Sequence, residues 1–194
     1  LHGVALFDRV ARHEPDITRA VAGKEKHGSR RKNFGIGGLV VAVADNYEVL
    51  LGAHPVQLGD EQMIENITVA ADKEVVLDNI AGNTLELQVE IEPQGAKQCG
   101  VKVCRSPDGA EQTLVYYDAA DQKLKIDVRK ASLGEGPKNI EAGPFALKDG
   151  ETLTLRVFVD KSVVEAFAND RQAAMRRIYP TRPDSVGVSL FSQG

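Results

Sequence analysis

Residues 155–169, LRVFVDKSVVEAFAN, decide the fold of this chain. Apolar side chains recur at every second residue, first over residues 155–159 and again over residues 163–168. A period of two residues places these side chains on one face of an extended strand. Asp160 and Lys161 separate the two runs, so the stretch predicts a tight β-hairpin with its turn at these residues.

The same alternation continues along most of the chain after Gly38. Residues 85–91, LELQVEI, and residues 124–128, LKIDV, place an apolar residue at every second position and a polar one between. About ten or more short strands, about 8–12 residues apart, predict an all-β fold, an antiparallel two-sheet β-sandwich of the jelly-roll or concanavalin-like kind. Besides the hairpin we expect strands over residues 39–44, 47–51, 67–70, 75–77, 85–91, 101–103, 114–117 and 124–128.

Glycine, proline and asparagine mark the expected connections. Asp45-Asn46 predicts a hairpin turn after residues 39–44, and Asp108-Gly109 and Asp149-Gly150 predict further turns. Residues 131–144 are rich in Gly, Pro, Ser and Glu, which predicts a long loop.

The first 38 residues do not share the alternation, and they divide the chain into two parts. Residues 1–38 form an N-terminal segment that is short and either irregular or helical, with a loosely helical spacing that Pro15 interrupts. It is a linker or the remnant of a preceding domain, and its charged run, residues 24–32, is either a solvated segment or a basic docking patch. Residues 39–194 form the β-sandwich domain.

Composition limits the possible classes of function. The 194 residues carry a net charge of −4 without a strong basic stripe, which argues against nucleic acid as a partner. No apolar run approaches the roughly 20 residues of a membrane span, and no secretory signal is recognisable. A trimmed chain would lack such a signal too, so the cellular compartment stays undetermined.

Nothing in the sequence predicts a metal or another cofactor. Cys99 and Cys104 are an odd number of residues apart, so on one regular strand they would point to opposite faces and could not form a disulfide. We expect both to be small buried or half-buried residues. The four histidines have no metal-ligand spacing, and the glycines of residues 35–38 are not followed by the Lys-Ser/Thr of a phosphate-binding loop.

Residues 159–167, VDKSVVEAF, fit each fixed position of a pattern like V-D-x-S-x-V-E-x-F, which is similar to the signature of the C-terminal β-sandwich of glycoside hydrolase family 32, the invertases, levanases and inulinases. Weaker similarity extends over residues 39–194. The positions that carry this resemblance as family-motif or structural residues are Asp160, Ser162, Glu165, Phe167, Arg176 and Tyr179.

The resemblance implies a partner and an absent active site. In this family a five-bladed β-propeller precedes the sandwich and hydrolyses β-fructofuranosyl bonds with retention, using carboxylates in N-D-P, R-D-P and E-C segments. Here Asn169-Asp170 is followed by Arg171, Arg182-Pro183-Asp184 has the wrong order, and neither cysteine follows a glutamate. We therefore predict no catalytic residue in this chain, although the parent enzyme would be a glycosidase.

Two functions follow as alternatives. The first is a non-catalytic module that packs on the catalytic propeller and stabilises it, in an enzyme acting on sucrose, levan or inulin; such a module should expose an apolar patch. The second is an independent carbohydrate-binding, lectin-like module, for which Tyr116, Tyr117 and Tyr179 are the possible sugar contacts. Packing in the core or at the rim is the simpler role for these tyrosines, and association through sheet edges is a third possibility.

Glu165 is the unusual residue of the hairpin. It shares one strand face with Val163 and Phe167. If that face is buried, the carboxylate needs a partner, and Arg176 or Arg177 on the following strand is the natural one.

Overall fold

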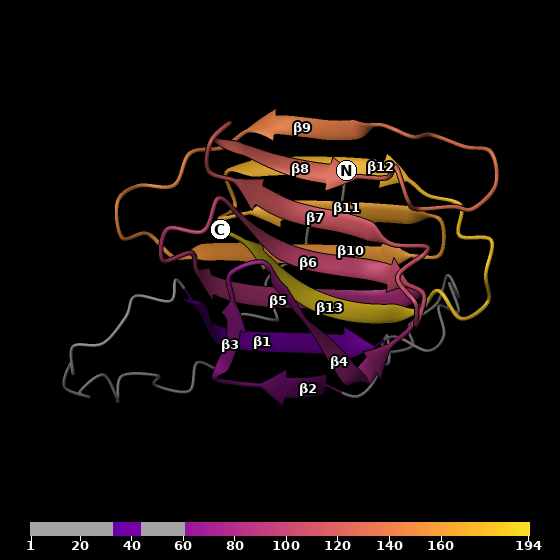
Figure 1. Ribbon diagram of the computed structural model, residues 1–194, viewed down its shortest axis with the longest axis horizontal. Coiled ribbons are helices and arrows are strands. Elements are labelled where there is room, and N and C mark those ends of the chain that lie inside the picture. The colour runs from indigo at the N-terminus through magenta and orange to yellow at the C-terminus, as the bar shows by residue number, and fades with distance from the viewer. Residues whose placement is uncertain (1–32, 44–60) are drawn as a thin grey trace, which may run out of the picture. The chain divides into compact units, whose positions relative to one another are not determined.

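The computed structural model describes residues 33–43 and 61–194. In this part of the chain every regular element is a β-strand, and every strand pairing is antiparallel (Figure 1). The described residues include no helix with the length and apolar character needed to cross a lipid bilayer. The predicted hairpin turn at Asp45-Asn46, its strand over residues 47–51 and the segment 1–32 lie outside the described residues.

The strands form two sheets. Sheet A has the order β12-β11-β10-β5-β1-β2, and β3 also pairs with β1. Its strands are β1 (Asn33–Val43), β2 (Glu61–Ile64), β3 (Ile67–Ala70), β5 (Thr84–Glu92), β10 (Leu153–Asp160), β11 (Val163–Ala168) and β12 (Gln172–Arg177). Sheet B has the order β4-β13-β6-β7-β8-β9. Its strands are β4 (Lys73–Ala81), β6 (Gln98–Arg105), β7 (Thr113–Asp118), β8 (Lys123–Asp127), β9 (Ile140–Pro144) and β13 (Gly187–Gln193).

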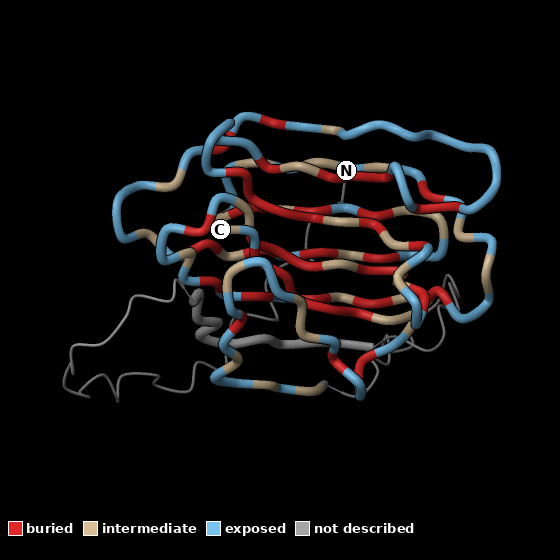
Figure 2. Tube along the Cα trace, in the orientation of Figure 1, coloured by how far each residue is buried: buried red, intermediate tan, exposed pale blue. Residues whose placement is uncertain are grey.

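The predicted two-sheet sandwich is confirmed. Every second side chain of β5 and β10 is buried, as the alternation predicted, and these side chains pack with those of sheet B in one hydrophobic core. Figure 2 shows the buried positions along the strands and the exposed positions in the connections. The largest fully buried apolar side chains are Ile80, Leu87, Ile91, Leu124, Ile126, Leu153, Leu155, Ile178 and Leu190.

The decisive hairpin consists of β10 and β11. Asp160 lies opposite Val163, so Lys161 and Ser162 alone make the turn, and Lys161 has a positive φ of 50°. The predicted turn is therefore shifted by one residue, because Asp160 still pairs in the ladder. Val164, Ala166 and Ala168 of β11 are completely buried. Between them, Val163 and Phe167 are partly exposed and Glu165 is exposed.

The prediction of one long loop over residues 131–144 is wrong at its end. Residues 140–144 form β9, which pairs with β8 from Asp127 to Lys123. β9 is an edge strand with little buried apolar surface, so its sequence lacks the alternation that identifies the inner strands. A Cβ atom at Gly143 would come within 2.4 Å of the Gln172 side chain, so that side chain would have to move to admit a larger residue.

The cysteines are both buried and free, which confirms their expected burial. The prediction that they point to opposite faces is wrong, because both belong to the hydrophobic core. Cys104 has a positive φ of 47°, and the pairing of β6 with β13 shifts register at this point. The resulting bulge adds one residue and restores the even spacing that places both thiols inside.

We expect Leu155→Ala to lower the free energy of unfolding by about 2–5 kcal/mol, because Leu155 is fully buried and its truncation leaves a cavity between the sheets. Gln88→Ala, an exposed position on the adjacent strand β5, is the matched control and should change stability by less than about 0.5 kcal/mol. Urea unfolding followed by circular dichroism measures both values. Equal stability of the two variants would contradict the proposed position of β10 in the core.

Candidate functional site

A pocket of about 360 Å³ lies where three turns meet beside the hairpin of the family-like motif. Lys161 comes from the β10–β11 turn, Asn83 from the β4–β5 turn, and the largest share of the lining from the corner between β12 and β13. Cys104 of the β6 bulge closes the pocket from the core side. The lining residues are Asn83, Cys104, Lys161, Pro180, Thr181, Arg182, Pro183, Ser185 and Val186.

Backbone hydrogen bonds hold these turns together. The Lys161 N–H donates to the Asn83 carbonyl at 2.6 Å, and the Gly82 N–H donates to the Val186 carbonyl at 2.8 Å. The Ile178 N–H donates to the Ser162 carbonyl at 2.9 Å, which joins the motif turn to the start of the corner. The pocket wall is thus fixed by main-chain contacts between segments far apart in the sequence.

A buried carboxylate anchors the corner. Glu111 is completely buried and accepts hydrogen bonds from the N–H groups of Leu133 and Thr181, both at 2.8 Å, and of Arg182 at 3.0 Å. The hydroxyl groups of Thr181 and Ser185 also donate to it, the latter at 2.6 Å. Burial acts to raise the pKa of Glu111, but these hydrogen bonds outweigh it and set the pKa at about 2. Glu111 is therefore an ionised, fully satisfied anchor at neutral pH.

An ion-pair network surrounds the anchor at the surface. Arg182 forms ion pairs with Asp108 and with Asp184, each at 2.7 Å. Hydrogen bonds from the Ser106 hydroxyl, the Ala110 N–H and the Arg182 guanidinium hold the pKa of Asp108 far below its usual value. The network ties the turn after β6 to the C-terminal corner.

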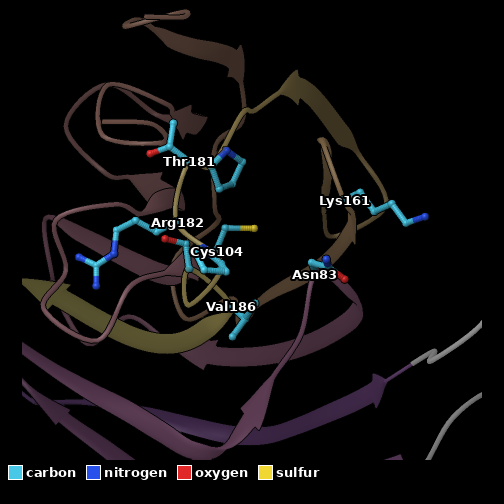
Figure 3. Close-up of a pocket in the computed structure, with 9 residues that line it drawn as sticks. Asn83, Cys104, Lys161, Thr181, Arg182 and Val186 are labelled. Carbon is cyan, nitrogen blue, oxygen red and sulfur yellow. The ribbon is translucent and has the colours of Figure 1, made fainter. Parts of the chain in front are cut away.

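The pocket does not carry the chemistry of a glycosidase. None of its lining residues is an aspartate or glutamate, whereas retaining hydrolysis needs two carboxyl groups about 5–5.5 Å apart. Figure 3 shows the Cys104 sulfur directed into the pocket, while the Lys161 amine and the Arg182 guanidinium point away from it. Burial, aided by the Glu111 charge, raises the pKa of the Cys104 thiol to about 12, so the thiol is protonated and a poor nucleophile. Within residues 62–194, no group of three or more His, Cys, Asp or Glu side chains could hold a metal ion.

The motif residues are not gathered in one site. Ser162 lies in the turn beside the pocket, and Asp160 is exposed at the end of β10. Glu165 and Phe167 lie on the outer face of sheet A, where Glu165 is exposed opposite Met175. Because that face is not buried, Glu165 does not need the arginine partner considered for a buried position.

Arg176 makes other contacts instead. It pairs with Glu141 at 3.3 Å and donates to the Asn139 side chain at 2.5 Å, so it joins β12 to the start of β9. This contact connects the two sheets along one edge.

The three tyrosines differ in exposure. Tyr116 and Tyr117 are 4% and 5% exposed and pack edge-on against Phe191 and Phe145, respectively. Tyr179 is 46% exposed, next to the pocket residue Pro180. Sugar rings stack on accessible aromatic faces, so Tyr179 is the one of the three that offers such a face.

The sequence of this chain is similar to those of known proteins. The sequence model of the family described as "Glycosyl hydrolases family 32 C terminal" matches residues 57–194. The 6(G)-fructosyltransferase of Asparagus officinalis is 36% identical over 93 residues, 46% of this chain. The levanase of Bacillus sp. (strain L7) is 31% identical over 127 residues, 62% of this chain. This chain spans 14% of the length of each of these two relatives.

Solved structures share the fold. The exo-inulinase from Aspergillus awamori aligns with a TM-score of 0.55 and 19% identity, over 73% of this chain and 35% of that one. A structure from A. japonicus CB05 aligns with a TM-score of 0.52 and 19% identity, over 83% of this chain and 33% of that one. At such identities the likeness concerns the fold alone.

We expect the anchor to make stability depend on pH. The pKa of Glu111 falls from an ordinary 4.5 to about 2 in the folded protein, so its ionised form stabilises the fold above pH 4.5, and this stabilisation is lost as the pH falls towards 2. The shift corresponds to a free energy on the order of 3 kcal/mol. Urea unfolding between pH 7 and pH 2.5 should show the wild-type advantage over Glu111→Gln shrinking in that window.

The exposed residue Glu165 supplies the control for this measurement. Glu165→Gln removes the same charge from the surface of β11 and should follow the wild-type curve. A constant difference between wild type and Glu111→Gln from pH 7 to pH 2.5 would show that the charge of Glu111 does not hold the corner.

Proposed function

Because the chain belongs to the family of C-terminal domains of glycosyl hydrolases family 32, we propose that it is the non-catalytic β-sandwich module of an enzyme that cleaves β-fructofuranosyl bonds. The parent enzyme would act on sucrose, levan or inulin. The module packs on the catalytic β-propeller of the same enzyme and stabilises it.

Two observations support this proposal. The family match over residues 57–194 takes in nearly all of the described sandwich, and the pocket beside the motif turn has no carboxylate in its lining. Retaining glycosidases place both acid groups in the cleft that holds the sugar. A sandwich whose pocket lining has no such pair fits a structural role better than a catalytic one.

The stabilising role has a physical basis in the sandwich itself. Its core is continuous between the two sheets, and its corner is held by the saturated Glu111 anchor, so the module presents a rigid surface. A rigid surface loses little conformational entropy on association, so more of the contact energy remains to stabilise the partner domain.

We expect this chain alone to release no fructose from sucrose, inulin or levan above a blank without protein, because the pocket beside the motif turn has no carboxyl group in its lining. The assay measures reducing sugar over 24 hours at high protein concentration, with the levanase of Bacillus subtilis (strain 168) as the positive control. Turnover that rises in proportion to the concentration of the purified chain would overturn the non-catalytic assignment.

A further inference from the structure

The outer face of sheet A carries an apolar surface that the core does not use. On β10, β11 and β12 every second side chain points away from the core. We name the apolar members of this set the outer patch; they are Phe158, Val163, Phe167, Ala173 and Met175. The patch spans three neighbouring strands at one end of the sheet.

The patch is held in a defined geometry. Phe158 and Phe167 meet edge-on, with ring centroids 6.0 Å apart and an interplanar angle of 90°. The Arg156 guanidinium lies 4.9 Å from the Phe158 ring centroid and is itself paired with Glu86 at 2.6 Å. The rings are thus fixed before any partner arrives, which lowers the entropy cost of association.

Core packing does not explain these side chains. Phe158 and Phe167 are only half-buried, and Met175 is 54% exposed. On this face Glu165 lies opposite both Phe158 and Met175, and Arg156 lies opposite Phe167, so the apolar side chains alternate with charged ones. Exposed apolar side chains gathered on one sheet face are typical of an interaction site. The sequence predicted such a patch for a module that lacks its partner domain.

The charge around the patch is uneven. Strand β5, next to β10, places Glu86, Glu90 and Glu92 on the same outer face, and the last two are exposed. Arg156 already pairs with Glu86, so the two exposed glutamates give the β5 side a negative character. A partner that fits has apolar groups facing Phe158 and Phe167, and basic groups facing Glu165 and the β5 side.

We propose that the outer patch is the surface on which the catalytic domain of the same polypeptide docks. This inference rests on the proposed function. The chain spans 14% of the length of the two relatives described above, so the partner is a domain much larger than this module. Because the family is a C-terminal one, that domain precedes the sandwich, and β1, the first described strand, lies in sheet A, two strands away from β10. The first described strand therefore belongs to the sheet that carries the patch.

The test compares two exposed residues on the outer faces of the two sheets. Met175→Asp places a charge in the patch on the edge strand β12, and Val76→Asp places the same charge on the edge strand β4 of sheet B, where Val76 is 44% exposed. Titration calorimetry measures binding of each chain to the separately expressed catalytic domain of the parent enzyme. We expect wild type and Val76→Asp to bind equally and Met175→Asp to bind at least tenfold more weakly, with the thermal unfolding midpoints of all three chains unchanged.

A charge reversal tests the second feature of the surface. Glu90→Lys should weaken binding several-fold at low salt, and the difference should diminish at high salt because exposed charges are then screened. Tighter or unchanged binding by Glu90→Lys would contradict the basic partner surface.

Several outcomes would overturn the assignment. If wild type binds and Met175→Asp binds equally well, the patch is not the docking surface, although the proposed function survives. If the wild-type chain does not bind the catalytic domain at all, the proposed function fails and the docking surface with it. Light scattering and a levan-binding assay test the other possible occupants. If Met175→Asp dissociates a dimer of this chain but binds the catalytic domain as wild type does, the patch contacts a second copy. If Met175→Asp abolishes levan binding and still binds the catalytic domain, the patch contacts carbohydrate.

Discussion

The structure depends on one apolar layer shared by two sheets. Neither sheet can cover its own inner face, so each inward side chain of β5 and β10 is buried against residues from sheet B. This requirement fixes the period of two in the strands, and it explains why the β6 bulge at Cys104 is tolerated: the extra residue returns the chain to the face that the core needs. The outer faces are free of this constraint and can serve other contacts.

A buried charge provides the second fixed point. The connection from β12 to β13 has no regular structure of its own, and its N–H groups would be unsatisfied without a partner. Glu111 accepts from this corner and from Leu133, so one carboxylate joins segments that lie 22 and about 70 residues away in the sequence. The corner in turn shapes the pocket beside the motif turn, which makes Glu111 a residue on which the local architecture relies.

The inner strands were predictable from sequence, because burial on one face leaves a clear alternation at Leu85 to Ile91 and in the hairpin. β9 was not, since an edge strand such as residues 140–144 needs no apolar face. Glu111 was also missed: a glutamate just after the Asp108-Gly109 turn resembles an exposed loop residue, and its donors come from distant segments. The motif predicted the family without predicting a site, because its residues divide between the turn, the core and the outer face of sheet A.

We therefore propose that the inner and outer faces of the module have different roles. The inner faces and the Glu111 anchor supply stability, and the outer face of sheet A is available to a catalytic domain. The most direct test is the rate at which the separately expressed catalytic domain loses fructoside hydrolysis on heating, with and without a saturating amount of this chain. We expect slower inactivation in the presence of the chain and an unchanged turnover rate before heating. The same inactivation rate in both samples would contradict this proposal.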